Sequence, residues 1–235
     1  MPVSTALDFS AALSRVDCGA QLPTPANLTF IVWANLGSTG GGTGQGIVAR
    51  TTNRGLGMNV NVGDAFEFLA LRATTSTQVT ATAANFKYFA TSKWVCIVSL
   101  FSAAGVNADQ QILIGDLLNY PVGPSSYSTQ LVGSGNLTAW DANLAIGAWT
   151  STGSLPLVSG KIAAVGIWNK VLSFTEIQKQ RFELLKRRFV ITPNCQGFWQ
   201  LGRGTGPQVD WSRQFPAGLV TNAVSTAGIP HNVWG

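Results

Sequence analysis

The sequence predicts an all-β fold: two antiparallel sheets packed face to face as a sandwich, with one short helix near residues 173–188. Short apolar runs recur along the 235 residues, and turn signals separate them at roughly the 8–12-residue spacing of a β-sandwich. Twenty-six glycines favour many tight turns over long helices. Because sandwiches commonly occupy about 200–250 residues as one unit, this length suits a single large domain.

Composition excludes several classes of protein. Charged residues make up 11% of the chain and hydrophobic residues 46%, whereas disordered chains are rich in charge and poor in hydrophobic residues. The most apolar stretches, such as Trp94–Phe101, are far shorter than the roughly 20 residues of a membrane span. We therefore expect a folded protein that does not enter a membrane. The net charge of +5 permits attraction to polyanions without requiring it.

Three cysteines and one histidine limit the metal and disulfide chemistry. Cys18, Cys96 and Cys195 lie far apart in the sequence, which argues against a disulfide framework and against a zinc cluster. His231 alone cannot build a metal site. The first residues contain neither a basic nor an apolar signal region. We therefore expect synthesis in a reducing cytoplasm, no bound metal and no cofactor.

Strand signals follow one another through the first half of the chain. Leu28–Asn35 is apolar on both faces, as an interior strand of a sandwich requires. The glycine-rich segment Ser38–Gly46 is expected to be a loop, because it offers few side chains large enough to pack. A meander of short strands is then predicted over Gly46–Arg50, Leu56–Val62, Ala65–Arg72 and Gln78–Ala83.

The second half adds further strands and the helix. Trp94–Phe101 predicts a buried strand, and three shorter strands are predicted over Gln111–Ile114, Leu144–Gly147 and Lys161–Trp168. Ser173 and Glu176 form a capping box, since Ser is a preferred N-cap and Glu three residues later completes the pair. This box begins a run of good helix formers that ends at Arg188, with an apolar stripe of Ile177, Leu184 and Leu185.

The last forty residues differ from the rest. A closing strand is expected to begin at Cys195, and the residues after it carry several glycines and prolines. So short a segment seldom builds a core of its own. We therefore expect a β-sandwich domain over residues 1–201 and an extended C-terminal tail over residues 202–235, which packs on the sandwich or on a neighbour.

Three runs of residues resemble the laminin-G-like and concanavalin A-like jelly-roll family, which includes lectins and glucanases. Trp94–Leu100 is similar to the family's central strand, and Asn143–Gly147 to a later strand of pattern l-x-i-G. Ser159–Ser173, followed by Glu176 and Ile177, matches the family's late signature at every position except the opening aromatic. The resemblance covers about residues 5–200 and implies a two-sheet jelly roll with a short helix packed at one edge.

A second resemblance concerns the tail. Val209–Ser212, with nearby glycines and a proline, is similar to the C-terminus of lectin-like proteins encoded in tailed-phage genomes. Lectins, glycosidases, adhesion modules and virion components share this fold, so the function has to be argued from sites.

The chain shows no catalytic pair of carboxylates. Laminarinase-type relatives carry an E-x-D-x-x-E strand, which places two carboxylates about 5–5.5 Å apart for retaining hydrolysis. Asp64 and Glu67 come closest to this pattern, but three residues apart on a strand they face opposite sides. His231 is expected to be a surface or packing residue and not a member of a catalytic triad. We expect no enzymatic activity.

Sugar binding by aromatic stacking is compatible with the sequence. Aromatic rings cover the apolar faces of sugars, and amides or carboxylates fix their orientation. The candidates bracket the Asn143–Gly147 strand or lie in the long loop before it: Trp140, Asp141, Asn143, Trp149, Tyr120 and Tyr127. Two other readings stay open: the tryptophans cap the sandwich core, and Asp141 with Asn143 either holds Ca²⁺ or makes turns to the backbone.

Two segments are candidates for attachment to a partner. The tail offers large aromatic anchors, namely Trp211, Phe215 and Trp234. The basic part of the helix either forms a solvated face or docks on an acidic surface, and it contains Lys179, Arg181, Lys186, Arg187 and Arg188. Aromatic and basic residues do not alternate there, so specific nucleic-acid binding is not expected.

These features give three functional hypotheses. The first is a non-enzymatic accessory protein of a tailed-phage virion, a capsid decoration protein that binds the major capsid protein or other virion proteins and also a cell-surface glycan. We expect such a protein to be made in the host cytoplasm and to form a homo-oligomer or repeated array in the virion. The second is a soluble or secreted carbohydrate-binding lectin module outside the cell. The third is a fragment related to glycoside hydrolases.

Overall fold

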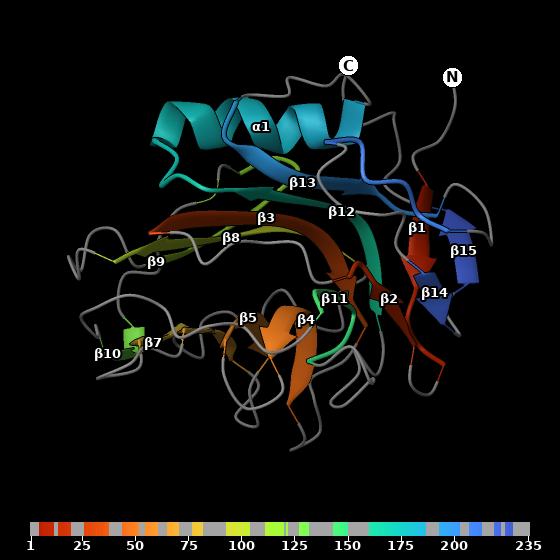
Figure 1. Ribbon diagram of the computed structural model, residues 1–235, viewed down its shortest axis with the longest axis horizontal. Helices are drawn as coiled ribbons and strands as arrows, with labels where there is room; N and C mark the ends of the chain where they lie inside the picture. Colours follow the sequence, from red (N-terminus) through yellow and green to blue (C-terminus); the bar gives the residue numbers. More distant parts are fainter. Residues whose placement is uncertain are drawn as a thin grey trace.

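Two antiparallel sheets face each other, and one helix lies on the outer side of one sheet (Figure 1). The computed structural model describes residues 5–11, 14–19, 26–37, 44–51, 55–60, 65–70, 77–81, 93–103, 111–119, 121, 127–131, 143–149, 160–186, 193–202, 207–212, 219–221 and 224–227. In these ranges no helix combines the length and the apolar character needed to cross a bilayer.

Sheet A contains seven strands of the described chain, in the order β15-β1-β12-β3-β8-β9, with β13 also paired to β12. All of these pairings are antiparallel. The strands are β1 (Thr5–Asp8), β3 (Asn27–Leu36), β8 (Trp94–Ser102), β9 (Gln111–Asp116), β12 (Gly160–Trp168), β13 (Cys195–Gln200) and β15 (Val224–Ala227).

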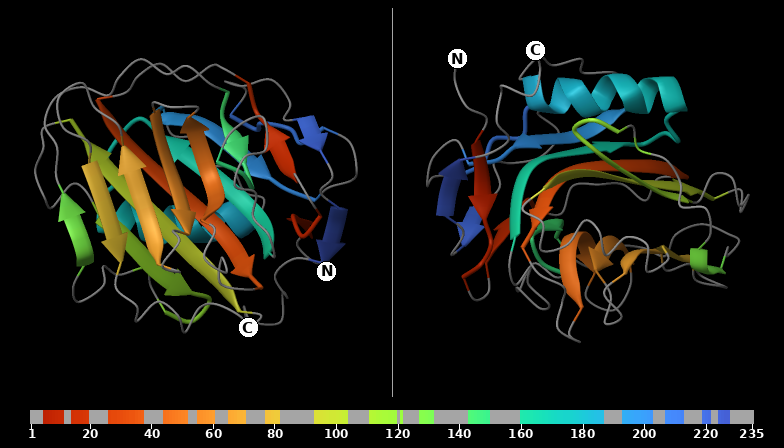
Figure 2. Two further views of the ribbon diagram at one scale, coloured as in Figure 1. Left: turned by 90° about the horizontal axis from the view of Figure 1, so that it is seen from below. Right: turned by 180° about the vertical axis from the view of Figure 1, so that it is seen from behind.

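Sheet B lies opposite and contains eight described strands, in the order β10-β7-β6-β5-β4-β11-β2-β14 (Figure 2). The central part β4–β7 is the predicted meander, in which each strand pairs with the next. The strands are β2 (Arg15–Asp17), β4 (Gln45–Thr51), β5 (Gly55–Val60), β6 (Phe66–Ala70), β7 (Thr77–Ala81), β10 (Tyr127–Leu131), β11 (Ala145–Ile146) and β14 (Leu219–Thr221).

Strand β3 lies between two cores, which explains why its sequence is apolar on both faces. Phe30 and Val32 are fully buried in the core between the two sheets. Ile31 and Trp33 alternate with them and are buried in a second core on the other side of sheet A, beneath the helix. Both faces of sheet A are therefore covered, which matches the prediction of an interior strand.

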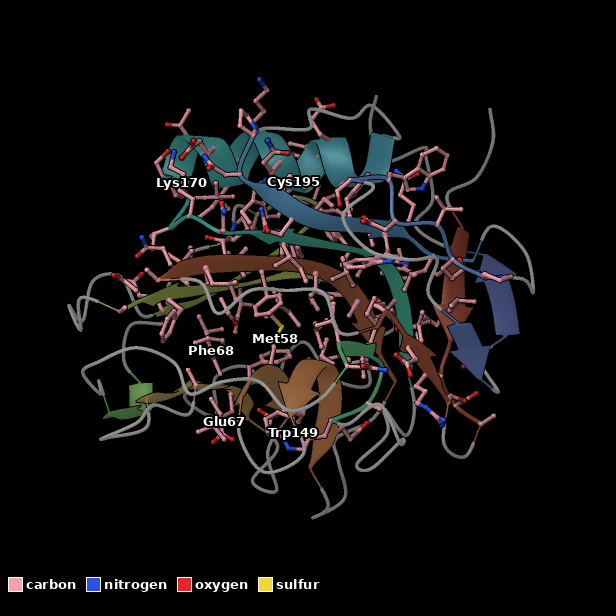
Figure 3. The ribbon with its side chains drawn as sticks, viewed as in Figure 1. Met58, Glu67, Phe68, Trp149, Lys170 and Cys195 are labelled. Carbon is pink, nitrogen blue, oxygen red and sulfur yellow. The ribbon has the colours of Figure 1, made fainter. Side chains whose placement is uncertain are left out.

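Sheet B contributes alternate residues to the main core. Met58 of β5 and Phe68 of β6 point into the space between the sheets (Figure 3). The Phe68 ring meets the ring of Phe101 edge to face, with a centroid distance of 6.3 Å. Such edge-to-face pairs are favourable because the positive ring edge approaches the negative ring face. Gly57 and Asn59 of β5 and Glu67 of β6 alternate with these inward residues, so they face the outer side of sheet B.

The helix α1 (Phe174–Lys186) begins at the predicted capping box and covers the outer face of sheet A (Figure 1). The Ser173 backbone N–H donates to Glu176 Oε2 at 2.8 Å, and the Glu176 N–H donates to Ser173 Oγ at 3.4 Å. Ile177 and Leu184 are buried, as the apolar stripe predicted. The third stripe residue, Leu185, has a side chain outside the described part.

Arg181 departs from the expected basic face of the helix. Its side chain is buried, Nη1 donates to the Asn119 carbonyl oxygen at 2.7 Å, and the guanidinium lies 4.3 Å from the centre of the Phe182 ring. The backbone carbonyl of Arg181 also accepts the indole N–H of Trp33 at 2.8 Å. Arg181 therefore joins α1 to sheet A and to the end of β9, and it is not available for docking.

The predicted strands are present with shifted ends, and the structure adds short strands that were not predicted. These are β1, β2, β10, β14 and β15. Tyr127 was expected in a loop, but it begins β10, which pairs with β7. Four of the added strands, β1, β2, β14 and β15, have only three or four residues, which is too short for a clear periodicity, and their pairing with a distant partner defines them.

The C-terminal segment contributes one strand to each sheet. In β14, Val220 lies opposite Val16 of β2, and in β15, Thr226 lies opposite Ala6 of β1. Only residues 222–223 separate the two strands. The segment therefore passes from the edge of sheet B to the edge of sheet A (Figure 1).

Candidate functional site

Trp149 lies on the outer face of sheet B, on the side away from the main core (Figure 3). It ends the segment 143–149, which contains β11 and runs beside β4, with Ala145 opposite Ala49. Gly147 has a φ of 80° and donates its N–H to the Ile47 carbonyl at 2.8 Å. A left-handed φ of this kind favours glycine, so the turn that carries the chain to Trp149 depends on this residue.

Two glycines leave space for Trp149. A Cβ at Gly57 would lie 2.7 Å from Cζ3 of the Trp149 ring and 2.7 Å from the Ala49 Cβ. A Cβ at Gly46 would overlap the backbone nitrogen of Trp149. The indole therefore rests directly on the backbone of β5, and its position is fixed by the absence of side chains beneath it.

Asn59 and Glu67 project from the same outer face. Asn59 is two residues along β5 from Gly57, so the two share a face and lie roughly 7 Å apart along the strand. Asn59 lies opposite Glu67 of β6, and its Nδ2 donates to Glu67 Oε1 at 3.3 Å. Figure 3 shows Glu67 and Trp149 on this outer side, opposite to Met58 and Phe68.

The polar pair is mostly shielded from water. Glu67 is only 8% exposed, and Asn59 is half-buried. An ionised carboxylate only accepts hydrogen bonds, so the Asn59 amide N–H faces Glu67 and its carbonyl oxygen Oδ1 faces away. This oxygen is buried and has no hydrogen-bond partner in the structure. Trp149, Asn59 and Glu67, with Gly57 beneath the ring, are called the outer-face site below.

Asn143 was predicted to contact a ligand, and the structure gives it a bond within the fold. Its Nδ2 donates to Asp17 Oδ2 at 3.2 Å, and Asp17 Oδ1 accepts the Gly19 N–H at 3.0 Å. The Leu144 N–H also donates to the Gly19 carbonyl, at 2.9 Å. Asn143 therefore joins the start of the β11 segment to the end of β2, at the opposite end of that segment from Trp149.

Several predicted site residues lie outside the described residues, namely Trp140, Asp141, Tyr120, Phe215, Trp234, Arg187 and Arg188. The side chains of Tyr127 and Lys186 lie outside them as well. Asp64 and His231 also lie outside the described residues. Of the Asp64–Glu67 pair, the structure therefore describes only Glu67. In the ranges that the structure describes, no group of three or more His, Cys, Asp or Glu residues could hold a metal ion.

The remaining attachment candidates take different positions. Lys179 is exposed on α1. Trp211 is partly buried against the core beneath the helix, and its backbone N–H donates to the Phe198 carbonyl at 2.8 Å. Asp210 beside it accepts hydrogen bonds from the Phe198 N–H at 2.7 Å and the Ser212 N–H at 3.0 Å. Trp211 thus packs along its own sandwich.

The three cysteines are free and buried. Burial raises the pKa of Cys96 and of Cys195 to about 12, and the Asp210 carboxylate adds to the rise at Cys195. Burial also raises the pKa of Cys18 well above its ordinary value. Thiols of this kind stay protonated near neutral pH, so they are poor nucleophiles and poor metal ligands.

Sequence reasoning selected Trp149 but missed the rest of the outer-face site. The sequence raises Glu67 only as half of a rejected catalytic pair, and it gives no reason to select Asn59 or Gly57 as site residues. The alternation of Phe66 and Phe68 with Glu67 would have placed this carboxylate on the outer face. Glu67 lies opposite Asn59 because of the register between β5 and β6, and no local sequence pattern predicts that register.

No family model matches the sequence, and no curated protein matches it. Solved structures do match. A candidate carbohydrate-binding protein from Bacteroides ovatus aligns with 98% of this chain at 12% identity and a TM-score of 0.66, and the chain spans 62% of that protein. The heptameric SAP-like pentraxin from Limulus polyphemus aligns over 99% of this chain and 98% of its own, at 12% identity and a TM-score of 0.56.

A third match is the binding domain of botulinum neurotoxin serotype D, at 11% identity and a TM-score of 0.51 over 76% of this chain and 42% of that one. Likeness at such low identity shows the fold alone. The chain is an antiparallel two-sheet jelly roll of the concanavalin A-like type, with one short helix in its described part, so the predicted fold class is confirmed. The link to tailed phages stays a prediction.

Proposed function

We propose that this protein is a non-enzymatic module that binds a glycan at the outer-face site. In this proposal one sugar ring stacks on Trp149, and its hydroxyl groups donate to Glu67 and Asn59. The observation that carries the proposal is the seating of the indole on Gly57, next to a carboxylate–amide pair on the same face.

The chemistry of the site supports sugar over other small ligands. A sugar presents an apolar C–H face, which an aromatic ring covers, and hydroxyl donors at its edge, which a carboxylate accepts. The Asn59 Oδ1 atom has no protein donor, so a ligand hydroxyl that reached it would satisfy a buried acceptor. Because Gly57 and Ala49 fix the ring before binding, little conformational freedom is lost when the ligand arrives.

The same residues support binding more than hydrolysis. Glycoside hydrolysis needs two carboxyl groups, roughly 5–5.5 Å apart in retaining enzymes and 6.5–9.5 Å apart in inverting ones. Of the described side chains that face outward from β4, β5 and β6, Glu67 is the one carboxylate. One carboxylate held by an amide suits ligand orientation. The Bacteroides ovatus protein, a candidate carbohydrate-binding protein of the same fold, is in keeping with this proposal.

Replacement of Trp149 tests the proposal. Trp149→Ala removes the stacking surface, and we expect the affinity for a glycan selected on an array to fall about tenfold or more, as is usual for a central tryptophan of a binding site. Trp149→Phe keeps a smaller ring and should retain part of the affinity. Calorimetric titration measures both, and Trp211→Phe is the matched control because Trp211 lies on the sheet A side.

Thermal melting checks that the variants are folded. If Trp149→Ala binds every array glycan as well as the wild type does, or if the wild type binds no glycan, the proposal is wrong.

A second candidate function is the virion accessory role predicted from the sequence. It is favoured by one observation: β15 is an edge strand of sheet A and β14 is an edge strand of sheet B, so one edge of each sheet lies on the same C-terminal segment. A strand at a sheet edge can pair with a neighbouring chain. We propose, in this case, attachment to a capsid or to neighbouring copies through this segment, with the protein exposed outside the cell after lysis. Terminase or head genes beside the coding gene would support it, and polysaccharide-utilisation genes would contradict it.

A further inference from the structure

Leu69 continues the apolar surface that Trp149 begins. In β6, Phe68 and Ala70 are buried in the main core, so Leu69 between them faces the outer side of sheet B. Leu69 lies directly opposite Gly57 of β5, the residue beneath the Trp149 ring. Residues opposite each other on one face of an antiparallel pair have their Cβ positions roughly 5 Å apart. Leu69 is half-buried, so part of its side chain is accessible on this face.

The indole of Trp149 extends from β4 toward the strand that carries Leu69. The backbone of Trp149 lies against Gly46 of β4, because a Cβ on that glycine would overlap the Trp149 nitrogen. The ring atoms nearest to Gly57 are Cζ3 and Cη2, which lie 2.7 and 3.1 Å from the position of a Cβ there. These atoms are at the end of the indole away from its backbone. The ring therefore reaches from β4 onto β5, and the next strand in the sheet is β6.

The apolar surface thus runs across the strands and not along them. The strands β4, β5 and β6 are neighbours in sheet B (Figure 2), and Trp149 with Leu69 spans all three. Along β5 the next outward residue after Gly57 is the polar Asn59, which is bonded to Glu67. Two strand spacings amount to roughly 10 Å, which exceeds the width of one sugar ring. Trp149 and Leu69 are called the apolar strip below.

The shape of the apolar strip suits one class of glycan. In a flat, linear chain, consecutive sugar rings lie nearly in one plane and present their apolar C–H faces in a row. In a chain that curls, the next ring turns away from the surface that holds the first. A sugar stacked on Trp149 therefore places its neighbour over Leu69 when the chain is flat.

Resting on the proposed function, we infer that Leu69 forms a second subsite beside Trp149, and that the outer-face site binds a flat, linear glycan through at least two consecutive sugars. The chain of the glycan runs across β4, β5 and β6. Leu69 is the residue that distinguishes such a chain from a single terminal sugar. The second sugar adds affinity because it removes the apolar surface of Leu69 from water, which is favourable in proportion to the area covered.

The length of the bound oligosaccharide tests the inference on the wild-type full chain. The probes are β-1,4-linked oligomers of glucose, xylose, mannose and N-acetylglucosamine with one to four sugars, titrated by calorimetry. In at least one series we expect the affinity to rise about tenfold from the monomer to the dimer or trimer. The α-1,4-linked oligomers of glucose curl, so they should show no such rise. Equal affinity along every β-1,4 series, or an equal rise along the α-1,4 series, would contradict the inference.

Replacement of Leu69 tests the second subsite itself. Leu69→Ala should remove most of the rise with chain length and leave the affinity for the monomer unchanged within about twofold. Leu69→Phe keeps a large apolar face and should retain the rise or increase it. The matched control is Leu117→Ala, since Leu117 is also half-buried but packs against the core beneath the helix. If Leu69→Ala fails to fold, the wild-type length series and Leu69→Phe still decide.

The outcomes separate the two claims. If no oligomer and no array glycan binds, the proposed function fails. If an array glycan binds in a way that depends on Trp149, but no β-1,4 series gains affinity with length, the second subsite is wrong while glycan binding stands. The same holds if Leu69→Ala keeps the full rise.

Discussion

Gly57 lies beneath the ring of Trp149, where a Cβ would come within 2.7 Å of Cζ3 and 3.1 Å of Cη2. Ala49 bounds the same space, with its Cβ 2.7 Å from that position. Contacts this short are not tolerated, so a side chain at residue 57 has to move the indole. At the scale of single residues, the binding surface therefore depends on the absence of a side chain at Gly57 as much as on Trp149.

Gly57→Ala should thus weaken glycan binding without removing any group that touches the ligand. We expect an affinity loss of about fivefold or more and a stability loss of about 1–3 kcal/mol, as is usual for overpacking. The double variant Gly57→Ala with Trp149→Phe removes the clashing ring atoms, so its stability loss should be smaller than the sum of the two single losses. Denaturant unfolding and titration measure these effects. A single variant with wild-type affinity and stability would show that the ring does not rest on Gly57.

Among the elements, α1 shows how a local sequence signal determines structure. Ser173 and Glu176 exchange hydrogen bonds at its first turn, and Lys170 forms an ion pair with Glu176 at 2.6 Å. The hydrogen bond from Lys170 is the largest of the effects that hold the pKa of Glu176 below its ordinary value of 4.5, followed by that from the Ser173 backbone. A carboxyl group with a lowered pKa stabilises the fold when it is ionised.

Glu176→Gln should therefore reduce stability only where the wild-type carboxyl is ionised. The stabilisation is fully present above the unfolded-state pKa, near 4.5, and is lost as the pH falls through the lower pKa of the folded state. Since the pair is more than a third exposed, we expect a loss of at most about 1 kcal/mol near pH 7. Urea unfolding at several pH values measures it. A difference between variant and wild type that persists at the lowest pH would contradict this account.

The elements also show where sequence reasoning succeeds. The run Ser159–Ile177 predicted β12 and the start of α1, because an apolar strand, a capping box and a helical stripe follow in order. The strands β1, β2, β14 and β15 were missed for the opposite reason. Ala6 pairs with Thr226 and Val16 with Val220, partners more than 200 residues away, and the strands are three or four residues long.

At the scale of the whole molecule, the C-terminal segment closes one end of the sandwich by adding the last strand to each sheet. Asp210 joins it to β13 by accepting the Phe198 N–H, and Gln208 joins it to the residues just after β13 by accepting the Gly202 N–H at 2.9 Å. Beyond them, β14 pairs with β2 and β15 pairs with β1. The segment therefore contributes to the fold, whatever it does for attachment.

Deletion of residues 219–235 should expose the edges of β1 and β2. We expect a lower melting temperature and self-association, because unpaired strand edges pair with other chains. Light scattering and thermal melting check this, with deletion of residues 228–235 as the control that keeps β14 and β15. A truncated protein that is monodisperse and melts like the wild type would mean that the two strands add nothing to the sandwich.

The site is a property of the whole molecule, and this limits how far the sequence predicts it. Trp149 could be predicted as a binding residue, because it follows a predicted strand and because an aromatic ring can stack on the apolar face of a sugar. Its place over Gly57 depends on the turn at Gly147 and on the pairing of β11 with β4. Trp149 and Gly57 are about 90 positions apart in the chain. Asn143, selected by the same reasoning, instead bonds to Asp17, because its end of the β11 segment meets β2.

Hydrogen–deuterium exchange on the full chain, with and without a saturating oligosaccharide, tests the central claim of glycan binding at the outer-face site most directly. We predict slower exchange on ligand addition in β5, β6 and residues 147–149, and no change in α1. Protection confined to α1 or to β14 and β15, with none in β5 and β6, would contradict the account.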